Sequence, residues 1–199
     1  MRHPLFLLTL PLATLASFSY LTVARAQITP DNSLGAESSV VAPNAEINKG
    51  IPSDRIDGGA TRGANLFHSF QDFNVNPGRG AYFSNPAGIA NILTRVTGGN
   101  VSNIQGILGV IGGNANLFLI NPNGIIFGRN ARLDVGGSFL GSTANSLIFK
   151  NGFEFSATNP QAPPLLTITA PVGLSYRENF KNITNQSRAV DDSRNIVGL

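Results

Sequence analysis

The sequence predicts an all-β protein built as a parallel β-helix, and three observations support this prediction. Short apolar segments return every ~8–10 residues between residues 81 and 149, a spacing typical of serial short strands. Turn residues such as Gly98-Gly99-Asn100 separate them, and Asn side chains can form ladders where successive coils superimpose. The segments alternate little between apolar and polar residues, as expected of strands buried on both faces. A β-sandwich remains the alternative, because it is also made of short strands joined by turns.

The first 26 residues have the features of a cleavable signal peptide. Arg2 begins a short basic region, Leu5–Leu15 is apolar, and Ala24-Arg25-Ala26 places small residues where a signal peptidase needs them. We therefore expect residues 1–26 to be removed by cleavage between Ala26 and Gln27. The alternative is an uncleaved membrane anchor, although prolines and hydroxyl residues interrupt the ~20 firmly apolar residues that a spanning helix needs.

Charge and cysteine content narrow the function classes. Removing Arg2 and Arg25 with the signal peptide lowers the basic residues from 14 to 12, against 11 acidic residues. A nearly neutral chain without a run of Lys or Arg gives no support for nucleic-acid binding. The sequence has no Cys, so the exported chain must be stabilised by burial and backbone pairing rather than by disulfides.

The mature chain begins with a polar region and then becomes apolar. Residues 27–52 are rich in turns, which favours a cap, and we place the N-terminal cap at about 27–55. Phe67, Phe70 and Phe73 follow at a spacing of three. Because Asn, Pro and Gly residues end this segment at once, we expect three buried rings stacked at a corner rather than a helix.

Serial strands are expected after the phenylalanines. The apolar segments are Ala81–Phe83, Ile92–Val96, Ile107–Ile111, Leu117–Ile120, Ile125–Phe127, Leu133–Val135, Phe139–Leu140 and Leu147–Phe149. We place the β-helix coils at about 56–175 and a truncated C-terminal coil at 176–199, where polar and charged residues collect. Because no terminal strand or cap precedes Leu199, we expect a chain that is cut short.

Asn121-Pro122-Asn123-Gly124 is the most informative turn, because apolar runs flank it on both sides. Pro122 sets φ near −65° for the first turn position, and Asn123-Gly124 tolerates the positive φ that follows. An Asn side chain can also accept a hydrogen bond from the backbone two residues further on. We therefore expect Asn121 to hold this corner.

Catalytic and ligand-binding patterns are scarce. His68, the one His left after signal removal, lies among aromatic residues, which favours a packing role. The close carboxylate pairs are Asp54/Asp57 and Asp191/Asp192, in segments expected to be solvated loops. We predict no catalytic residues, no metal site and no cofactor.

Arg132 and Asp134 would share one face of a strand by its period of two. Such charges on a β-helix keep open a second function, a secreted carbohydrate-binding or polysaccharide-cleaving protein.

Three motifs occur in a specific order. They are Phe70-Gln71-Asp72-Phe73-Asn74-Val75, Asn85-Pro86-Ala87-Gly88-Ile89 and Asn121-Pro122-Asn123-Gly124-Ile125. Together they resemble the amino-terminal secretion domain of filamentous haemagglutinins, the exported partners of two-partner secretion systems, which is also called the haemagglutination activity domain. The resemblance runs from about Gln27 to the end of the chain. In the first Asn-Pro motif, many members have Asn-Pro-Asn-Leu where this chain has Ala87-Gly88 after the proline.

This resemblance implies a right-handed parallel β-helix with an N-terminal cap and no catalysis. It implies export by the general secretion machinery, transit through the periplasm, and release or display at the cell surface. The implied partner is a dedicated outer-membrane β-barrel transporter with periplasmic recognition domains, and the domain then nucleates folding of a long β-helical passenger. Adhesion to surface glycans would belong to a passenger absent here.

The candidate recognition or turn residues are Asn85, Pro86 and Asn121–Ile125. Two interpretations of these residues stay open, a purely structural turn and direct contact with the transporter. Strand addition to a β edge is a second route of recognition.

Overall fold

The computed structural model describes residues 27–164, 169–178, 181–188, 190 and 199. The predicted signal peptide, with Ala26 at its end, and the Asp191/Asp192 pair lie outside the described residues. Within the described part, the helical content is one 3-10 turn, η1 (Gly35–Glu37). No helix in that part is long and apolar enough to cross a membrane.

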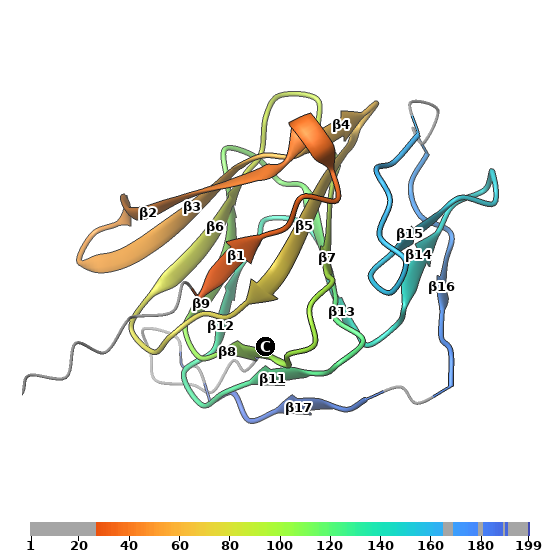
Figure 1. The fold of residues 1–199 in the computed structure, drawn as a ribbon. Coiled ribbons are helices and arrows are strands. Elements are labelled where there is room, and N and C mark those ends of the chain that lie inside the picture. The colour runs from red at the N-terminus through yellow and green to blue at the C-terminus, as the bar shows by residue number, and fades with distance from the viewer. Residues whose placement is uncertain (1–26, 165–168, 179–180, 189, 191–198) are drawn as a thin grey trace, which may run out of the picture.

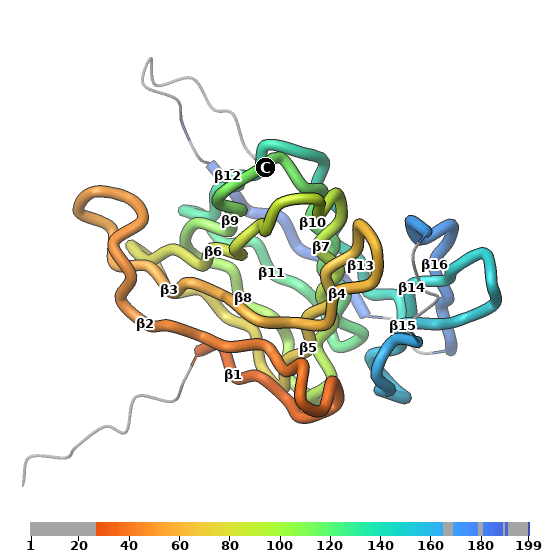
Figure 2. The backbone as a smooth tube through the Cα atoms, turned by 90° about the horizontal axis from the view of Figure 1, so that it is seen from above, coloured from red at the N-terminus to blue at the C-terminus, as the bar shows by residue number. Residues whose placement is uncertain are grey.

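The chain winds into a parallel β-helix with three faces, seen from the side in Figure 1 and from above in Figure 2. Face 1 contains β3 (Ile51–Gly58), β6 (Gly80–Ser84), β9 (Ile107–Ile111) and β12 (Arg132–Asp134). Face 2 contains β5 (Asn65–Phe73), β7 (Asn91–Val96), β10 (Asn116–Ile120) and β13 (Phe139–Ser142). Face 3 contains β8 (Ser102–Ile104), β11 (Ile125–Phe127) and β17 (Ile183–Asn185).

Strands of successive coils pair in parallel within each face. Apart from the pair of β11 and β17, register partners within these faces are separated by 22 residues at the closest (Leu117 and Phe139) and 27 at the widest (Ser53 and Gly80). A coil therefore takes slightly more than twenty residues, divided among three short strands and three corners. The parallel pairing confirms the predicted β-helix and excludes the β-sandwich, whose sheets are antiparallel.

Antiparallel strands cover the first coil. Face 1 begins with β2 (Ser39–Asn48), which pairs antiparallel with β3. On face 2, β1 (Ile28–Pro30) and β4 (Ala60–Arg62) pair antiparallel with β5. As a result, β3 and β5 have strand neighbours on both sides, and the edge that a first coil would otherwise expose is closed.

The coil that contains β12 and β13 is interrupted by an excursion outside the β-helix. After β13 the chain forms a small antiparallel sheet of β14 (Ser146–Ile148), β15 (Glu154–Ser156) and β16 (Gly173–Ser175), which stands beside face 2 in Figure 1. The chain then returns to the β-helix as β17, which pairs in parallel with β11 and is the third strand of face 3.

Two apolar cores explain why the strands alternate so little. Leu117 and Leu119 of β10 point into the helix with the inner core. Ile120 points outward into a second core with Phe67, where residues of the excursion such as Leu147 cover face 2. Face 2 is therefore buried on both sides, as its continuous apolar runs predicted.

Two expectations from the sequence are wrong. Phe67, Phe70 and Phe73 do not form a corner but belong to β5, where Phe67 joins the outer core and Phe70 the inner core. The spacing of three suggested a corner because apolar side chains lie on both faces of this strand. Asp54 and Asp57 lie on strand β3 rather than in solvated loops. Each of the eight strands expected between residues 81 and 149 overlaps an observed strand.

Candidate functional site

The Asn-Pro-Asn-Gly segment forms the corner between β10 on face 2 and β11 on face 3. The side-chain oxygen of Asn121 accepts a hydrogen bond from the backbone N–H of Asn123 at 2.9 Å. The N–H of Gly124 donates to the Asn121 carbonyl at 3.1 Å, and Gly124 has φ +118°, which favours glycine. The corner therefore has the turn bond expected from the sequence.

The same asparagines also bind the corner of the preceding coil. The Asn121 amide donates to the Asn100 carbonyl at 3.0 Å and to the Ser102 hydroxyl at 2.9 Å. The Asn123 amide donates to the Gly98 carbonyl at 2.7 Å. Asn121 is 0% exposed, so its polar atoms are used within the protein. These contacts join two successive corners of the helix.

The first Asn-Pro motif lies at another corner, between β6 and β7. The N–H of Asn85 donates to the Ile111 carbonyl at 2.8 Å, and that of Ile89 to the Pro86 carbonyl at 3.2 Å. The Asn85 amide is satisfied when its oxygen accepts from the Ala115 N–H at 3.2 Å. Unlike the second motif, this corner has an exposed tip, formed by Pro86, Ala87 and Gly88.

An asparagine ladder runs along face 2, where Asn65, Asn91 and Asn116 are register partners on successive coils. The Asn91 amide donates to the Asn65 oxygen at 2.9 Å, and the Asn116 amide to the Asn91 oxygen at 3.0 Å. An amide group carries both donor and acceptor, so identical side chains satisfy one another from coil to coil. The expected asparagine ladder is present.

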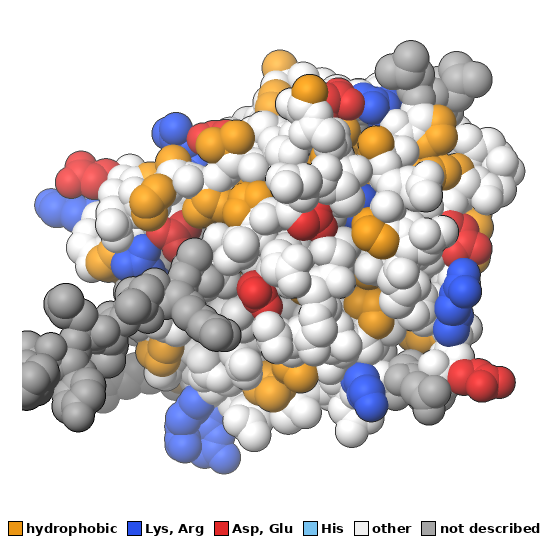
Figure 3. Space-filling model, in the orientation of Figure 1, with side chains coloured by type: hydrophobic (Ala, Val, Ile, Leu, Met, Phe, Trp, Pro, Cys, Tyr) orange, Lys and Arg blue, Asp and Glu red, His pale blue; other side chains and the backbone are white. Residues whose placement is uncertain are grey.

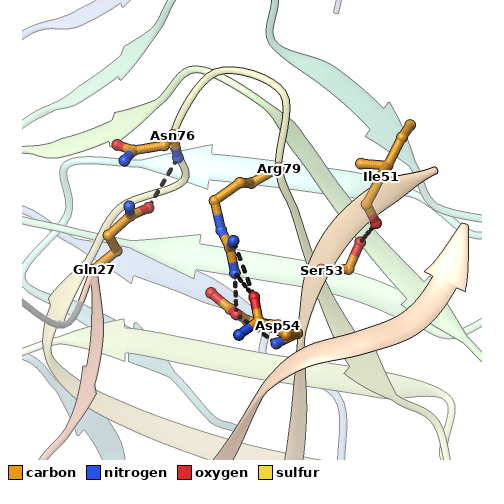
Figure 4. Close-up of polar contacts among 7 residues, drawn as sticks. Gln27, Ile51, Ser53, Asp54, Asn76 and Arg79 are labelled. Carbon is orange, nitrogen blue, oxygen red and sulfur yellow. Dashed lines mark hydrogen bonds and ion pairs between the residues drawn. The ribbon is translucent and has the colours of Figure 1, made fainter. Parts of the chain in front are cut away.

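Carboxylates of the first coil are paired with arginines. Figure 4 shows Arg79 and Asp54 pointing toward each other, with Nη2 and Oδ1 2.7 Å apart. Asp57 on the same strand bonds Arg55 at 2.8 Å. Although partial burial raises the pKa of Asp57, hydrogen bonds from Ser84 and Arg55 lower it below its usual value. These ion pairs give the carboxylates of Asp54 and Asp57 a structural role.

His68 is completely buried inside the helix beside Phe83. Its Nδ1 lies 3.0 Å from the Ser39 hydroxyl of the covering strand β2. Burial lowers the pKa of His68 to about 3, opposed by the charge of Asp57. The imidazole is therefore neutral at ordinary pH, and its place in the core matches the packing role expected.

Arg132 and Asp134 share the outer face of β12, as their spacing predicted. The Tyr82 hydroxyl donates to Asp134 at 3.0 Å. In the described part of the chain, no group of three or more His, Cys, Asp or Glu residues could hold a metal ion. On the face shown in Figure 3, charged side chains are scattered among uncharged side chains and backbone rather than gathered in one patch.

Sequence reasoning missed Arg95, which is 0% exposed on β7. The sequence contains a pattern that could have revealed this buried arginine, because Ile92-Leu93-Thr94-Arg95-Val96 places it within an apolar strand. A cation in that position requires several buried partners.

The described residues form a parallel β-helical domain. Antiparallel strands cap its first coil, and asparagine side chains link its successive corners. Residues 26–198 match the sequence model of the TPS secretion domain. The heme/hemopexin-binding protein of Haemophilus influenzae is 30% identical over 145 residues, which are 71% of this chain and 14% of that protein's length. The chain belongs to the TPS secretion domain family, the secretion domain of two-partner systems.

Proposed function

We propose that this domain targets an exported protein to a dedicated outer-membrane β-barrel transporter. The general secretion machinery delivers the chain to the periplasm, where periplasmic domains of the transporter recognise it. The protein then leaves the cell or stays at its surface. The observation that supports this function is the family match over residues 26–198, on a parallel β-helical fold.

The two Asn-Pro motifs have different roles in this proposal. Asn121 and Asn123 hold the helix corner, since their amides bond the preceding coil. Pro86, Ala87 and Gly88 form the most exposed part of the two motifs, which a transporter can reach. The transporter therefore contacts the first motif, while the second keeps the coils in register.

The domain also nucleates β-helix folding. In the described part of the chain, the last strand of each face has a strand neighbour on one side alone. These strands are β12, which pairs with β9, β13, which pairs with β10, and β17, which pairs with β11. Their other edges carry the backbone groups that a further parallel coil would use. Because antiparallel strands close the first coil, coils add in one direction. Adhesion and glycan binding belong to a passenger.

The domain is non-catalytic and uses no cofactor in this proposal. Several half-buried carboxylates in the described part of the chain have structural partners, as Asp54 has in Arg79. Asp31 accepts from the hydroxyls of Ser69 and Thr97. These two carboxylates are held in contacts that stabilise the fold, rather than free to act as the acid–base pair that cleaves a polysaccharide.

A secretion assay tests the proposed roles. The full chain is co-expressed with a candidate partner barrel, and its amount in the medium is compared for Ala87→Lys, Asn121→Ala and Asn123→Ala. Circular dichroism measures the fold of each variant. Ala87→Lys should lose release while keeping the fold, whereas the asparagine variants should lose release only as far as they unfold. The matched control is Asn130→Lys, on an exposed corner elsewhere. Equal release of Ala87→Lys and the control would refute the contact.

A further inference from the structure

Arg95 lies at the meeting point of three segments that are distant from one another in the sequence. It extends from β7 on the outer side of face 2, and its guanidinium is fully buried. Its Nε donates to the hydroxyl of Ser69 on β5, and its Nη2 to that of Ser33, both at 2.8 Å. Nη1 donates to the Ser156 carbonyl, and Nη2 to the Gln161 carbonyl, both at 3.0 Å. These four partners satisfy most of its five N–H groups.

Residues 31–37, here called the cap loop, supply the counter-charge. Asp31 accepts from the Ser33 hydroxyl at 2.5 Å and from the Ser69 hydroxyl at 2.8 Å. Both serines therefore stand between the carboxylate and the guanidinium of Arg95. Burial raises the pKa of Asp31, but the hydroxyl and backbone hydrogen bonds outweigh it and hold the pKa below its usual value. The carboxylate stays charged beside the buried cation.

Residues 154–163, here called the strap, cover the arginine from the other side. The ring of Phe155 lies 4.1 Å from the centre of the Arg95 guanidinium, a cation–π distance. Beyond β15 the strap has no regular strand structure, so the bond from Arg95 to Gln161 holds a segment with few ladder bonds of its own.

A second arginine repeats this arrangement. Arg62 of β4 makes a bidentate ion pair with Glu37 of the cap loop, at 2.7 and 2.9 Å. Its Nε donates to the Pro163 carbonyl of the strap at 3.0 Å. Each arginine thus donates hydrogen bonds to the cap loop and to the strap at the same time.

We propose that the cap loop and the strap form one locking unit, which closes over face 2 only when both are in place. If the strap lifts, Arg95 loses two carbonyl partners and the Phe155 ring. If the cap loop lifts, Arg95 loses Ser33 and the nearby charge of Asp31. Either loss leaves a buried cation with too few partners, which is costly, so half-closed states are disfavoured.

This unit links the beginning of the domain to its later part. The cap loop precedes all the coils, and the strap follows β13. The first coil is therefore locked only after the chain as far as Pro163 has joined the fold. A domain that crosses a membrane as an extended chain would close at the end of its passage rather than at the start.

Hydrogen exchange on the full chain tests the proposal through reciprocal variants. Ser33→Ala alters the cap loop, and exchange is read at Ala157, Thr158 and Asn159 of the strap, whose N–H groups are hydrogen-bonded. Phe155→Leu alters the strap, and exchange is read at Gly35 and Glu37, whose N–H groups are bonded within the cap loop. Each variant should raise exchange about tenfold or more at the opposite segment, while Leu108–Val110 in the inner coil stays protected.

Arg95→Gln should open both segments together, and the matched control Arg79→Gln, an arginine paired elsewhere, should open neither. The proposal is overturned if each of the two reciprocal variants affects its own segment alone. It is equally overturned if all three segments accelerate together, because the domain would then open as a whole. Ser33→Ala and Phe155→Leu keep the test decisive even where Arg95→Gln fails to fold.

Discussion

Replacing Asn121 by alanine should destabilise the domain by about 3 kcal/mol. The side chain makes three hydrogen bonds at 2.9–3.0 Å, because it accepts one from the Asn123 N–H and donates two, to Asn100 and Ser102; a longer one from the Asn123 amide is 3.3 Å. A neutral hydrogen bond contributes about 0.5–1.5 kcal/mol net, so three of them give a loss near the middle of about 1.5–4.5 kcal/mol. This is a large part of the total stability of about 5–15 kcal/mol typical of a domain.

The assay is equilibrium urea unfolding of the purified protein, followed by circular dichroism. Asn100→Ala is the matched control, because that side chain is exposed and bonds Asp72 at the surface, so its loss should stay within about 0.5 kcal/mol. If Asn121→Ala loses less than about 1 kcal/mol, or no more than Asn100→Ala, the corner does not depend on this asparagine and the structural assignment is refuted.

Three further predictions concern the core, a corner and the ladder. Because burial lowers the pKa of His68 from 6.5 to about 3, the unfolded state takes up the proton first, and stability should fall below pH 6.5 by about 1.4 kcal/mol per unit. Acid titration of unfolding should show this slope between pH 6 and 4.5, and His68→Gln should abolish it. Gly98→Ala should cost about 1–3 kcal/mol, because its Cβ would lie 2.1 Å from the Gln71 carbonyl oxygen, whereas Gly99→Ala meets no atom within 4 Å and should be neutral in urea unfolding. Asn91→Ala removes both bonds of the central ladder position and should lower the thermal midpoint more than any single exposed Asn→Ala change.

Most strands between residues 81 and 149 could be predicted from the sequence, because their short apolar runs coincide with the observed strands. Strand β8 was missed, since Ser102-Asn103-Ile104 contains one apolar residue and pairs through its backbone with β11. The corner bond of Asn121 to Asn123 was predictable because it is local. Its bonds to Asn100 and Ser102 depend on the stacking of two coils, which no local pattern specifies.

The locking unit could not be predicted for the same reason. The partners of Arg95 are 26 to 66 residues away along the chain, so their meeting depends on the finished topology. The excursion after β13 likewise interrupts the coil rhythm, and β17 pairs with β11 across it. The spacing of apolar residues predicts the strands of the coils, whereas contacts between distant segments join the cap loop to the strap.

The most direct test of the secretion function compares cells with and without a cognate outer-membrane barrel. The full chain is expressed in both, and the protein in medium and periplasm is quantified and its N-terminus sequenced. The proposed function predicts protein beginning at Gln27 in the medium only when the barrel is present, and in the periplasm when it is absent. Equal release without the barrel, or retention with every cognate barrel, would contradict it.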